Sequence, residues 1–242
     1  MAKLVVVGTP IGNLEDISIR IIKAIFSTNT IIAEDTRNFK KLVNLLKKKY
    51  LHLIKVVTNN QDLEINKKRF QLISYREQNH IKTIYKIISI LKNEDCLLVS
   101  DSGMPTISDP GYLLIKECIN SNIDIEIIPS ASAYQCGLIL SGLPTYKFTF
   151  LGFLPRSKKK IQTLIKSNIQ NTICFYESPN RILSTLKIIR EISENFRVSI
   201  SKELTKKYEN TIRGKIDEII SFLSNNHIRG EITVTIYCNS KN

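Results

Sequence analysis

A loop rich in glycine, proline and acidic residues, SDSGMPTISDPG at 100–111, has the composition of a ligand-binding segment. It follows the apolar run CLLV, and Asp101 near its start can accept hydrogen bonds from an amine or a hydroxyl of a ligand. Gly103 and Gly111 permit a close approach of the backbone, and Pro105 and Pro110 restrict the loop. The alternative is an ordinary connection between a strand and a helix, although such connections are usually shorter.

A second glycine-rich turn, GTPIGN at 8–13, follows the first apolar run of the chain. It lacks the lysine of the GxxxxGK[ST] motif, so it is not a nucleoside triphosphate loop, and it lacks the third glycine of GxGxxG. The acidic residue followed by GxGxG that is usual in Rossmann methyltransferases is also absent. Taken alone, this turn predicts no particular ligand.

Polar segments follow several apolar runs at the points where strands are expected to end. Because ligands of an open α/β sheet bind at the carboxyl ends of its strands, we expect four of these loops to meet at one edge. A further loop, YESPNR at 176–181, follows a later strand in the same way. The four loops are GTPIGN, EDTRN (34–38), SDSGMPTISDPG and PSASA (129–133).

Apolar strands alternate with helical patterns up to residue 145. Continuous apolar strands that alternate with helices are typical of a parallel sheet with helices on both faces. Residues 1–145 are therefore expected to form an α/β domain with a parallel five-stranded sheet. The expected strands are 3–9, 30–35, 69–75, 96–101 and 124–130, with a possible strand at 52–58, and the expected helices are 16–28, 40–49, 83–91 and 111–121.

The pattern changes after Pro144, where strands outnumber helices. Residues 146–242 are expected to form a second α/β domain with a mixed five-stranded sheet, without a Gly/Ser-rich linker before it. The expected strands are 148–154, 172–178, 197–204, 209–214 and 230–238, and the expected helices are 158–167 and 179–194.

The composition is that of a globular protein that can bury a core. The 242 residues are 43% apolar and 24% charged. No apolar run approaches the roughly 18 residues of a membrane span. The apolar run at the N-terminus is too short for a signal peptide, so a cytoplasmic protein is expected.

The cysteines and histidines form no motif of a metal site or a disulfide framework. Neither CxxC nor HExxH occurs, and the three histidines are scattered. We expect no metal ion, and we expect reduced thiols packed as small apolar groups at Cys96, Cys118, Cys136, Cys174 and Cys238.

A formal net charge of +13 favours a polyanionic partner, with RNA or DNA first. The alternative is a composition bias, because lysine, isoleucine and asparagine are all used heavily and many lysines can be solvated surface residues. Charge alone leaves both interpretations open.

Taken in order along the chain, the motifs resemble the RsmI family, the bacterial 16S rRNA cytidine 2′-O-methyltransferases of the tetrapyrrole methylase superfamily. The resemblance covers nearly the whole chain. It rests on GTPIGNLEDIS (8–18), AEDTR (33–37), SDSGMPTISDPGY (100–112), IPSASA (128–133), SGLP (141–144), FLGFLPR (150–156), FYESPNRI (175–182), SKELTKKYE (201–209) and GEITVTI (230–236).

The resemblance implies two α/β domains with S-adenosylmethionine between them, held by loops rather than by a Rossmann crevice. One departure is Ser130, which stands where the family usually has glycine; either cofactor affinity suffers, or the loop does not need a positive φ there. The implied cofactor-binding residues are Pro10, Ile11, Asp101, Ser102, Gly103, Met104, Pro105, Ser132, Ala133, Tyr176, Glu177, Leu204, Ile232 and Thr233.

Transfer of a methyl group to a ribose 2′-hydroxyl also needs an oriented acceptor and a proton acceptor. Asp35 can take the proton or orient the ribose, Arg37 can hold a neighbouring phosphate, and Asn13 can orient the substrate. The alternative for Asp35 and Arg37 is a structural ion pair at a helix N-terminus. Asp16 can help to orient the substrate or act as a plain helix N-cap.

The basic segment after FLP is the first choice for contact with the RNA backbone: Arg156, Lys158, Lys159 and Lys160. The alternative is a solvated helix face. Glu77 and Asn79 are further candidates for the acceptor side, or surface residues.

The resemblance implies as substrate the 16S rRNA of the 30S subunit, at cytidine 1402. It also suggests a homodimer. Two other functions keep part of this interpretation: a methyltransferase acting on a small tetrapyrrole, and a non-catalytic RNA-binding assembly factor. The basic charge and the AEDTR and FLGFLP segments stand against the tetrapyrrole.

Overall fold

The computed structural model describes residues 2–59, 62–76 and 80–239, so Glu77 and Asn79 lie outside the described residues. The chain divides into two compact units, 1–131 and 132–242. The division falls before the helix α6 (Ala133–Ser141) and not near residue 146, because this helix packs on the strands of the second unit.

The first unit is a parallel five-stranded sheet with the strand order β3-β2-β4-β1-β5. All of its strand pairs are parallel, as the sequence predicted. Its strands are β1 (Lys3–Val7), β2 (Thr30–Ala33), β3 (Gln71–Ser74), β4 (Cys96–Val99) and β5 (Asp124–Ile128). Its helices are η1 (Leu14–Asp16), α1 (Ile19–Ser27), α2 (Thr36–Thr58), α3 (Asp62–Lys67), α4 (His80–Leu91) and α5 (Tyr112–Asn120).

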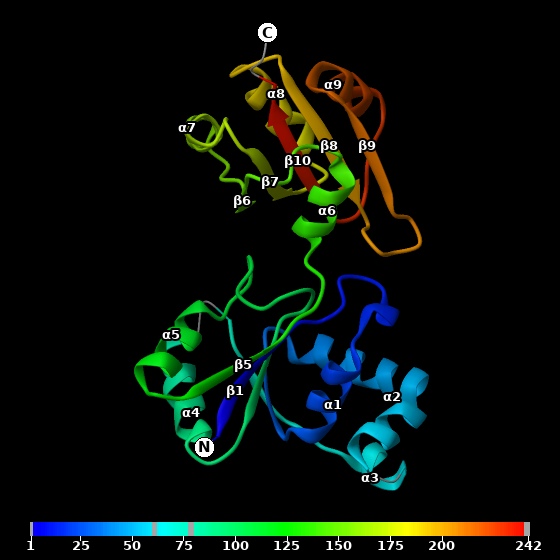
Figure 1. The fold of residues 1–242 in the computed structure, drawn as a ribbon, viewed down its shortest axis with the longest axis vertical. Coiled ribbons are helices and arrows are strands. Elements are labelled where there is room, and N and C mark those ends of the chain that lie inside the picture. The colour runs from blue at the N-terminus through cyan, green and yellow to red at the C-terminus, as the bar shows by residue number, and fades with distance from the viewer. Residues whose placement is uncertain (1, 60–61, 77–79, 240–242) are drawn as a thin grey trace. The chain divides into compact units, whose positions relative to one another are not determined.

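Helices cover both faces of this sheet, with α1 and α2 on one side and α4 and α5 on the other (Figure 1). Successive side chains of a strand point to opposite faces. In β1, Val5 and Val7 accordingly pack in the cluster that contains α1 and α2, whereas Leu4 and Val6 pack in the cluster that contains α4 and α5. Burial on both faces explains why these strands are continuous apolar runs.

The prediction of a possible strand at 52–58 is wrong, because these residues form the last two turns of α2. β-Branched Val56, Val57 and Thr58 favour a strand locally. Ile54 is nevertheless fully buried in the hydrophobic cluster between α2 and the sheet, so tertiary packing overrides this preference. The helix carries a kink at Tyr50, where φ is −126° and ψ is 26°.

The second unit is a mixed five-stranded sheet with the order β6-β7-β10-β8-β9. β6 and β7 are parallel, and the other neighbours are antiparallel. Its strands are β6 (Phe148–Phe153), β7 (Thr172–Glu177), β8 (Phe196–Lys202), β9 (Asn210–Lys215) and β10 (Ile232–Cys238). Besides α6, its helices are α7 (Lys158–Ser167), α8 (Ile182–Arg190) and α9 (Ile216–Asn225).

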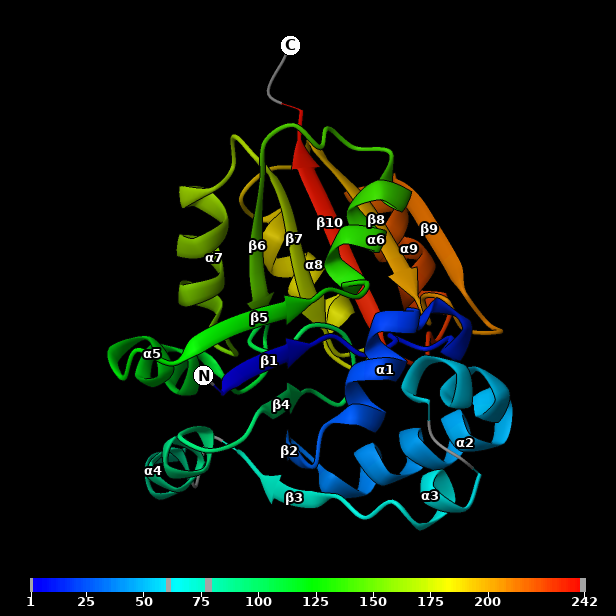
Figure 2. The same cartoon turned by 60° about the horizontal axis from the view of Figure 1, so that its bottom comes forward.

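The two faces of the second sheet are covered differently (Figure 2). Ile232, Val234 and Ile236 of β10 pack in the cluster that contains α7, α8 and α9. The opposite face is covered by α6, whose Gly137 lies against Thr233 of β10. Helix α9, which follows β9 directly and begins at Ile216, was not among the expected helices.

All five cysteines are free thiols, and four of them are buried. Burial raises the pKa of Cys96 to about 12 and that of Cys118 to about 11, so these thiols are unreactive. Within the described residues, no group of three or more potential ligand side chains is placed to hold a metal ion. No helix in the described part of the chain has both the length and the apolar character that a bilayer crossing requires.

Candidate functional site

The glycine-rich turn after β1 is joined to the loop after β4, as expected for loops at one edge of a parallel sheet. The backbone of Thr9 and that of Gly103 exchange two hydrogen bonds, with N···O distances of 2.8 and 3.1 Å. Ile11 is buried beside Gly103, at 3.4 Å from where a Cβ of Gly103 would lie. The prediction that these loops meet is confirmed.

The loop after β5 joins the same group through Ser130. Its amide lies 3.2 Å from the sulfur of Met104, and its hydroxyl donates to the carbonyl of Thr9. The three loops pack closely around Gly8. A Cβ at this position would lie 2.5 Å from the Met104 sulfur and 2.6 Å from the Cβ of Ser130, so a larger residue does not fit without a shift. Ser130 is not among the residues with positive φ, so the loop does not need the torsion that glycine would supply.

The loop after β4 stores backbone strain. Thr106 and Ser108 have φ values of 72° and 67°, which side chains other than glycine rarely adopt. Gly103 and Gly111 also have positive φ, at 77° and 145°. Strain of this kind persists only where the surroundings enforce it, and it is concentrated at ligand sites. The observed geometry therefore favours a ligand-binding loop over an ordinary connection.

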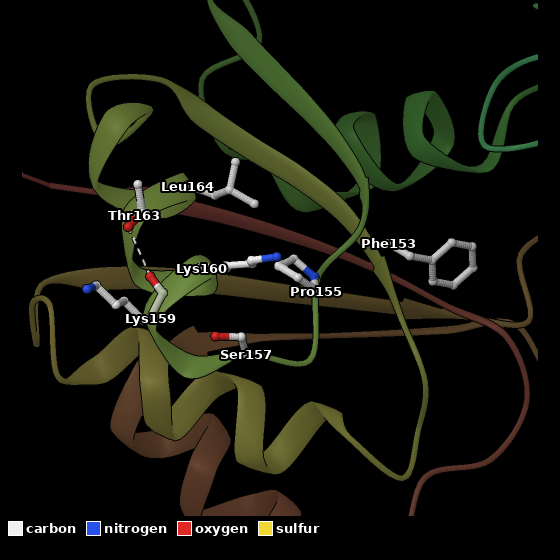
Figure 3. Close-up of a pocket in the computed structure, with 7 residues that line it drawn as sticks. All are labelled: Phe153, Pro155, Ser157, Lys159, Lys160, Thr163 and Leu164. Atoms are coloured by element: carbon white, nitrogen blue, oxygen red, sulfur yellow. Dashed lines mark hydrogen bonds between the residues drawn. The ribbon is translucent and has the colours of Figure 1, made fainter.

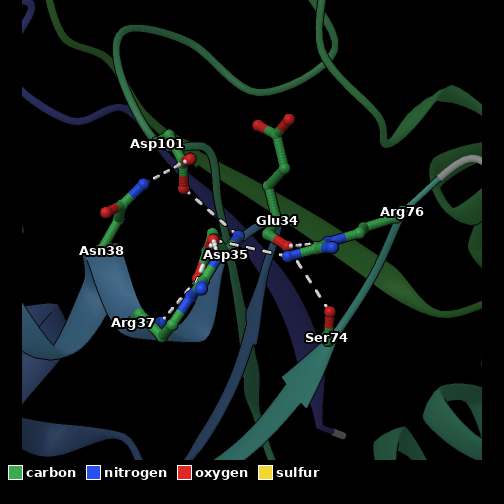
Figure 4. A network of polar contacts seen from close by, with 7 residues as sticks. All are labelled: Glu34, Asp35, Arg37, Asn38, Ser74, Arg76 and Asp101. Atoms are coloured by element: carbon green, nitrogen blue, oxygen red, sulfur yellow. Dashed lines mark hydrogen bonds and ion pairs between the residues drawn. The ribbon is translucent and has the colours of Figure 1, made fainter.

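A polar network lies where β2, β3 and β4 end (Figure 4). Asp35 is the N-cap of α2, and one of its carboxylate oxygens accepts a hydrogen bond from the amide of Arg37 at 2.8 Å. The guanidinium of Arg37 donates to both oxygens of Asp35, at 3.0 and 2.6 Å. Arg76 forms a longer ion pair with Asp35 at 3.4 Å.

These contacts show the structural ion pair between Asp35 and Arg37 that was one of the two alternatives. Hydrogen bonds from the side chain and the amide of Arg37 hold the pKa of Asp35 well below its ordinary value. A carboxylate with such a low pKa is a weak proton acceptor, so the geometry favours an orienting role for Asp35. Arg37 is 79% exposed and keeps donors free for a phosphate.

Asp101 links the loop after β4 to the start of α2. Its carboxylate accepts hydrogen bonds from the side-chain amide of Asn38 at 2.7 Å and from the backbone amide of Asp35 at 3.2 Å. Asp101 remains exposed, and a carboxylate has further acceptor sites. A ligand donor can therefore still bind to it.

Asp109, in the same loop, is a further candidate that the sequence pattern did not single out. Burial, together with the nearby charge of Glu34, raises its pKa to about 7 despite a hydrogen bond from Ser100. Burial likewise raises the pKa of Glu34, helped by the charge of Asp101. Like-charged neighbours and partial desolvation are typical of catalytic carboxylates. The SDPG sequence was a signal for a loop, but it did not reveal these neighbours.

Asn13 and Asp16 have local roles in the turn after β1. The side chain of Asn13 accepts a hydrogen bond from the amide of Glu15 and so caps the short helix η1. Asp16 is not the N-cap of α1, because Ser18 caps that helix by accepting from the amide of Ile21. The substrate-orienting role of Asn13 stays a prediction.

In the second unit, Tyr176 is fixed by aromatic neighbours and by α6. Its hydroxyl accepts a hydrogen bond from the amide of Tyr134 at 3.2 Å. Its ring lies 5.0 Å from that of Phe150 and 5.5 Å from that of Phe153, and Phe150 in turn stacks on Tyr134. Edge-to-face and stacked rings at these distances attract one another. The end of β7 is therefore rigid at this residue.

The other predicted cofactor residues of this unit lie around β10. Thr233 pairs with Tyr176 in the sheet, and Ile232 pairs with Glu177. The turn that contains Leu204 lies beside the start of β10, because Glu203 donates its amide to the carbonyl of Glu231. Glu203 and Thr205, on either side of Leu204, have positive φ values of 50° and 64°. Ser132 and Ala133 begin α6, which lies across this strand.

Glu177 is a structural carboxylate rather than a free one. It is only 3% exposed. Its oxygens accept hydrogen bonds from the amide of Ser178 at 2.8 Å and from the hydroxyl of Thr185 at 2.7 Å, and Arg181 lies 3.4 Å away. These internal partners favour a role in fixing the loop after β7. Its contact with a cofactor stays a prediction.

The basic segment at the start of α7 borders an open pocket of about 680 Å³ (Figure 3). Lys158 is bound to Glu191 at 2.7 Å, so its charge is compensated. Lys159 and Lys160 line the pocket instead, and Arg156 is exposed nearby in the sequence. The lining residues are Phe153, Pro155, Ser157, Lys159, Lys160, Thr163 and Leu164.

Comparison with protein families and curated sequences gives a consistent result. The family model of the tetrapyrrole (corrin/porphyrin) methylases matches residues 3–220. The ribosomal RNA small subunit methyltransferase I of Thermotoga maritima is 42% identical over 238 residues, which cover 98% of this chain and 98% of that protein. The protein of the same name from Bacillus subtilis is 38% identical over 239 residues, covering 98% of this chain and 75% of that one.

The fold is also that of solved methyltransferases. A uroporphyrin-III C-methyltransferase from Thermus thermophilus, solved as a complex with S-adenosyl homocysteine, superposes with a TM-score of 0.61. The two proteins are 9% identical, and the match covers 98% of this chain and 97% of that one. At this identity the likeness is evidence for the fold alone.

Proposed function

Because the chain belongs to the tetrapyrrole methylase family and, within it, to the ribosomal RNA small subunit methyltransferase I proteins, we propose that it methylates 16S rRNA. The acceptor is the ribose 2′-oxygen of cytidine 1402. The observation that carries this proposal is 42% identity over nearly the full length of a protein with that name. The likeness to a uroporphyrin methyltransferase, at 9% identity, is evidence for a common fold and gives no information about the substrate.

The proposed methyl donor is S-adenosylmethionine, which supplies an electrophilic methyl group. The chemical groups of the residues present match those of such a ligand. Gly103, at φ 77°, leaves open backbone next to Ile11, and the exposed Asp101 and Ser102 offer acceptors for an amine or hydroxyls. The proposed donor-binding residues of the first unit are Pro10, Ile11, Asp101, Ser102, Gly103, Met104 and Pro105, and those of the second unit are Ser132, Ala133, Tyr176, Glu177, Leu204, Ile232 and Thr233.

Methyl transfer forms one O–C bond, breaks one S–C bond and releases the proton of the 2′-hydroxyl. We propose Asp109 as the acceptor for this proton. With a pKa of about 7, a large fraction of this carboxyl group is deprotonated at neutral pH, and the carboxylate is still basic enough to take a proton. Asp35, Arg37 and Asn13 orient the acceptor nucleotide in this proposal. Lys159, Lys160 and Arg156 bind the RNA backbone, whereas Lys158 contributes less because of Glu191.

Two measurements test the function. Ribose methylation of 16S rRNA is mapped in a strain that lacks the protein, and we expect unmodified cytidine 1402. Purified protein is then incubated with 30S subunits and radiolabelled S-adenosylmethionine, and we expect label in 16S rRNA at that nucleotide. Unchanged methylation in the deletion strain contradicts the proposal.

Transfer of label to uroporphyrinogen instead of RNA would support the tetrapyrrole alternative. Light scattering of the same sample tests the proposed homodimer.

A further inference from the structure

A second open pocket lies in the first unit, between α2 and the segment that leads into β3. It lies at the amino end of β3, whereas the polar network around Asp35 lies at the carboxyl end, where Ser74 and Arg76 are found. Its volume is about 360 Å³. The residues that line it are Phe39, Lys40, Val43, Asn44, Lys47, Lys68, Arg69, Phe70 and Leu72.

The charge of this pocket is entirely positive. Four of the nine lining residues are cations, namely Lys40, Lys47, Lys68 and Arg69, and none is a carboxylate. Like charges around one hollow repel one another, and a bound anion removes that repulsion. The pocket therefore has the electrostatic character of an anion site.

Among the described residues, the two less exposed lysines of the pocket donate to neutral oxygens. The ammonium of Lys47 donates to the carbonyl of Asn66 at 3.3 Å, and that of Lys68 donates to the side-chain oxygen of Asn29 at 3.3 Å. Neither lysine forms an ion pair with any residue that the structure describes. Burial lowers the pKa of both side chains, and an anion bound between them would raise it again.

The floor of the pocket is apolar and well packed. Phe39 and Val43 are buried, and the ring of Phe39 meets that of Phe70 edge to face at 5.5 Å. Lys68 lies over the ring of Phe70 at 5.6 Å, which holds its ammonium at the pocket. This contact and the hydrogen bond to Asn29 hold Lys68 before a ligand binds, and preorganisation of this kind reduces the entropy lost on binding.

We propose that this pocket binds phosphodiester groups of the RNA substrate, through Lys47 and Lys68 inside and Lys40 and Arg69 at its rim. The inference rests on the proposed function for the identity of the polyanion. A hollow of about 360 Å³ accommodates a phosphate with its sugar but is too small for a helix of an acidic protein. Arginine and lysine side chains supply most phosphate contacts in RNA and DNA complexes.

The test compares two double variants of the full chain that remove the same charge from the same helix. K40A/K47A removes two cations of the pocket, whereas K41A/K48A removes their exposed neighbours on α2, which do not line it. K68A tests the cation on the opposite wall. Binding to a fluorescent fragment of the 16S rRNA decoding region is measured by anisotropy at several salt concentrations.

We expect K40A/K47A to bind the RNA about 10-fold more weakly, with a slope of log K against log salt that is shallower by about 2. K68A is expected to lower the slope by about 1, and K41A/K48A to stay within about twofold of the unmodified protein. Equal losses in the two double variants, or no loss in either, overturn the proposal. Equal competition by polyglutamate and by RNA for the pocket also overturns it.

Calorimetry with S-adenosylmethionine on every variant shows whether the protein remains folded and able to bind the methyl donor. If the unmodified protein binds the RNA through this pocket but transfers no methyl group, the proposed function fails and this inference stands. If the unmodified protein methylates 30S subunits and K40A/K47A binds RNA as tightly, only the inference fails.

Discussion

Asp109 of the first unit is a partly buried carboxylate and Glu177 of the second is a fully buried one, and their neighbours also differ. Glu177 accepts hydrogen bonds from Ser178 and Thr185 and lies beside Arg181. Asp109 is near Glu34 and Asp101, whose negative charges raise its pKa, and a hydrogen bond with Ser100 lowers it only in part. Removal of a buried charge whose hydrogen bonds are satisfied leaves its partners unpaired and destabilises the fold, whereas a carboxylate near like charges is poised to change its protonation state.

The backbone around the two carboxylates differs in the same direction. The loop of Asp109 contains Thr106 and Ser108 with positive φ, and no residue of 178–181 is among those with positive φ. Strain is retained at ligand sites and is rare in loops whose task is to connect. Sequence resemblance assigned Glu177 to cofactor binding and did not single out Asp109, whereas the environments suggest catalysis for Asp109 and support of the fold for Glu177.

The largest expected effect is that of Asp109→Asn on methyl transfer. An amide cannot accept the proton, so we expect the single-turnover rate on 30S subunits to fall by about 100-fold or more. In the unmodified protein the rate should rise as the pH increases through about 7, because Asp109 must lose its proton first, and the variant should lack this rise. Asp124→Asn, at an exposed edge-strand residue, is the control. A variant that keeps more than half of the rate contradicts the assignment.

Glu177→Ala should act on stability instead. It leaves the hydroxyl of Thr185, the amide of Ser178 and Arg181 without their carboxylate, so we expect the free energy of unfolding to fall by about 3 kcal/mol. Urea denaturation measures this loss, and Glu177→Gln, which keeps the shape and one acceptor, should lose less. If stability were normal and S-adenosylmethionine bound weakly, Glu177 would act in the proposed donor site and not as a support of the fold.

The pH dependence of stability gives a third contrast. The fold raises the pKa of Asp109, so it favours the protonated form. The resulting stabilisation is present below the unfolded pKa of about 4 and is lost as the pH rises through about 7. Asp109→Asn should therefore be more stable than the unmodified protein at pH 8. We expect a gain of about 1 kcal/mol, because solvent screens the charge of the partly exposed carboxylate and reduces the effect. An equal difference at pH 5 and pH 8 contradicts the raised pKa.

The smallest expected effect concerns the strained loop. Thr106→Gly relieves a φ of 72°, and part of that gain is offset by the greater freedom of glycine in the unfolded chain. We expect the free energy of unfolding to rise by about 0.5 kcal/mol. Ser178→Gly, at a position beside Glu177 without positive φ, should lower it by at least a similar amount, because glycine adds its entropy cost and the amide of Asn180 loses the hydroxyl that accepts from it. Thermal unfolding measures both, and equal signs for the two variants would remove the contrast.

Much of the fold could be predicted from the sequence because its signals are local. Both sheets and the ten strands that form them follow from apolar runs bounded by turn residues, and α7 has the bounds that were expected. The end of α2 could not be predicted, because β-branched Val56 and Val57 favour a strand while the burial of Ile54 decides for a helix. Helix α6 follows the first sheet in sequence but packs on the second.

The sequence by itself determined which loops follow strands, and parallel strand order then brought the turn after β1 to the loop after β4. Only the tertiary structure decided what the charged groups do. Asp35 became an ion-paired N-cap, Glu177 a buried support and Asp109 a carboxylate of raised pKa. The physical reason is that a charge depends on burial and on neighbours distant in sequence, such as Glu34 for Asp109, whereas the alternation of apolar residues is already written in adjacent positions.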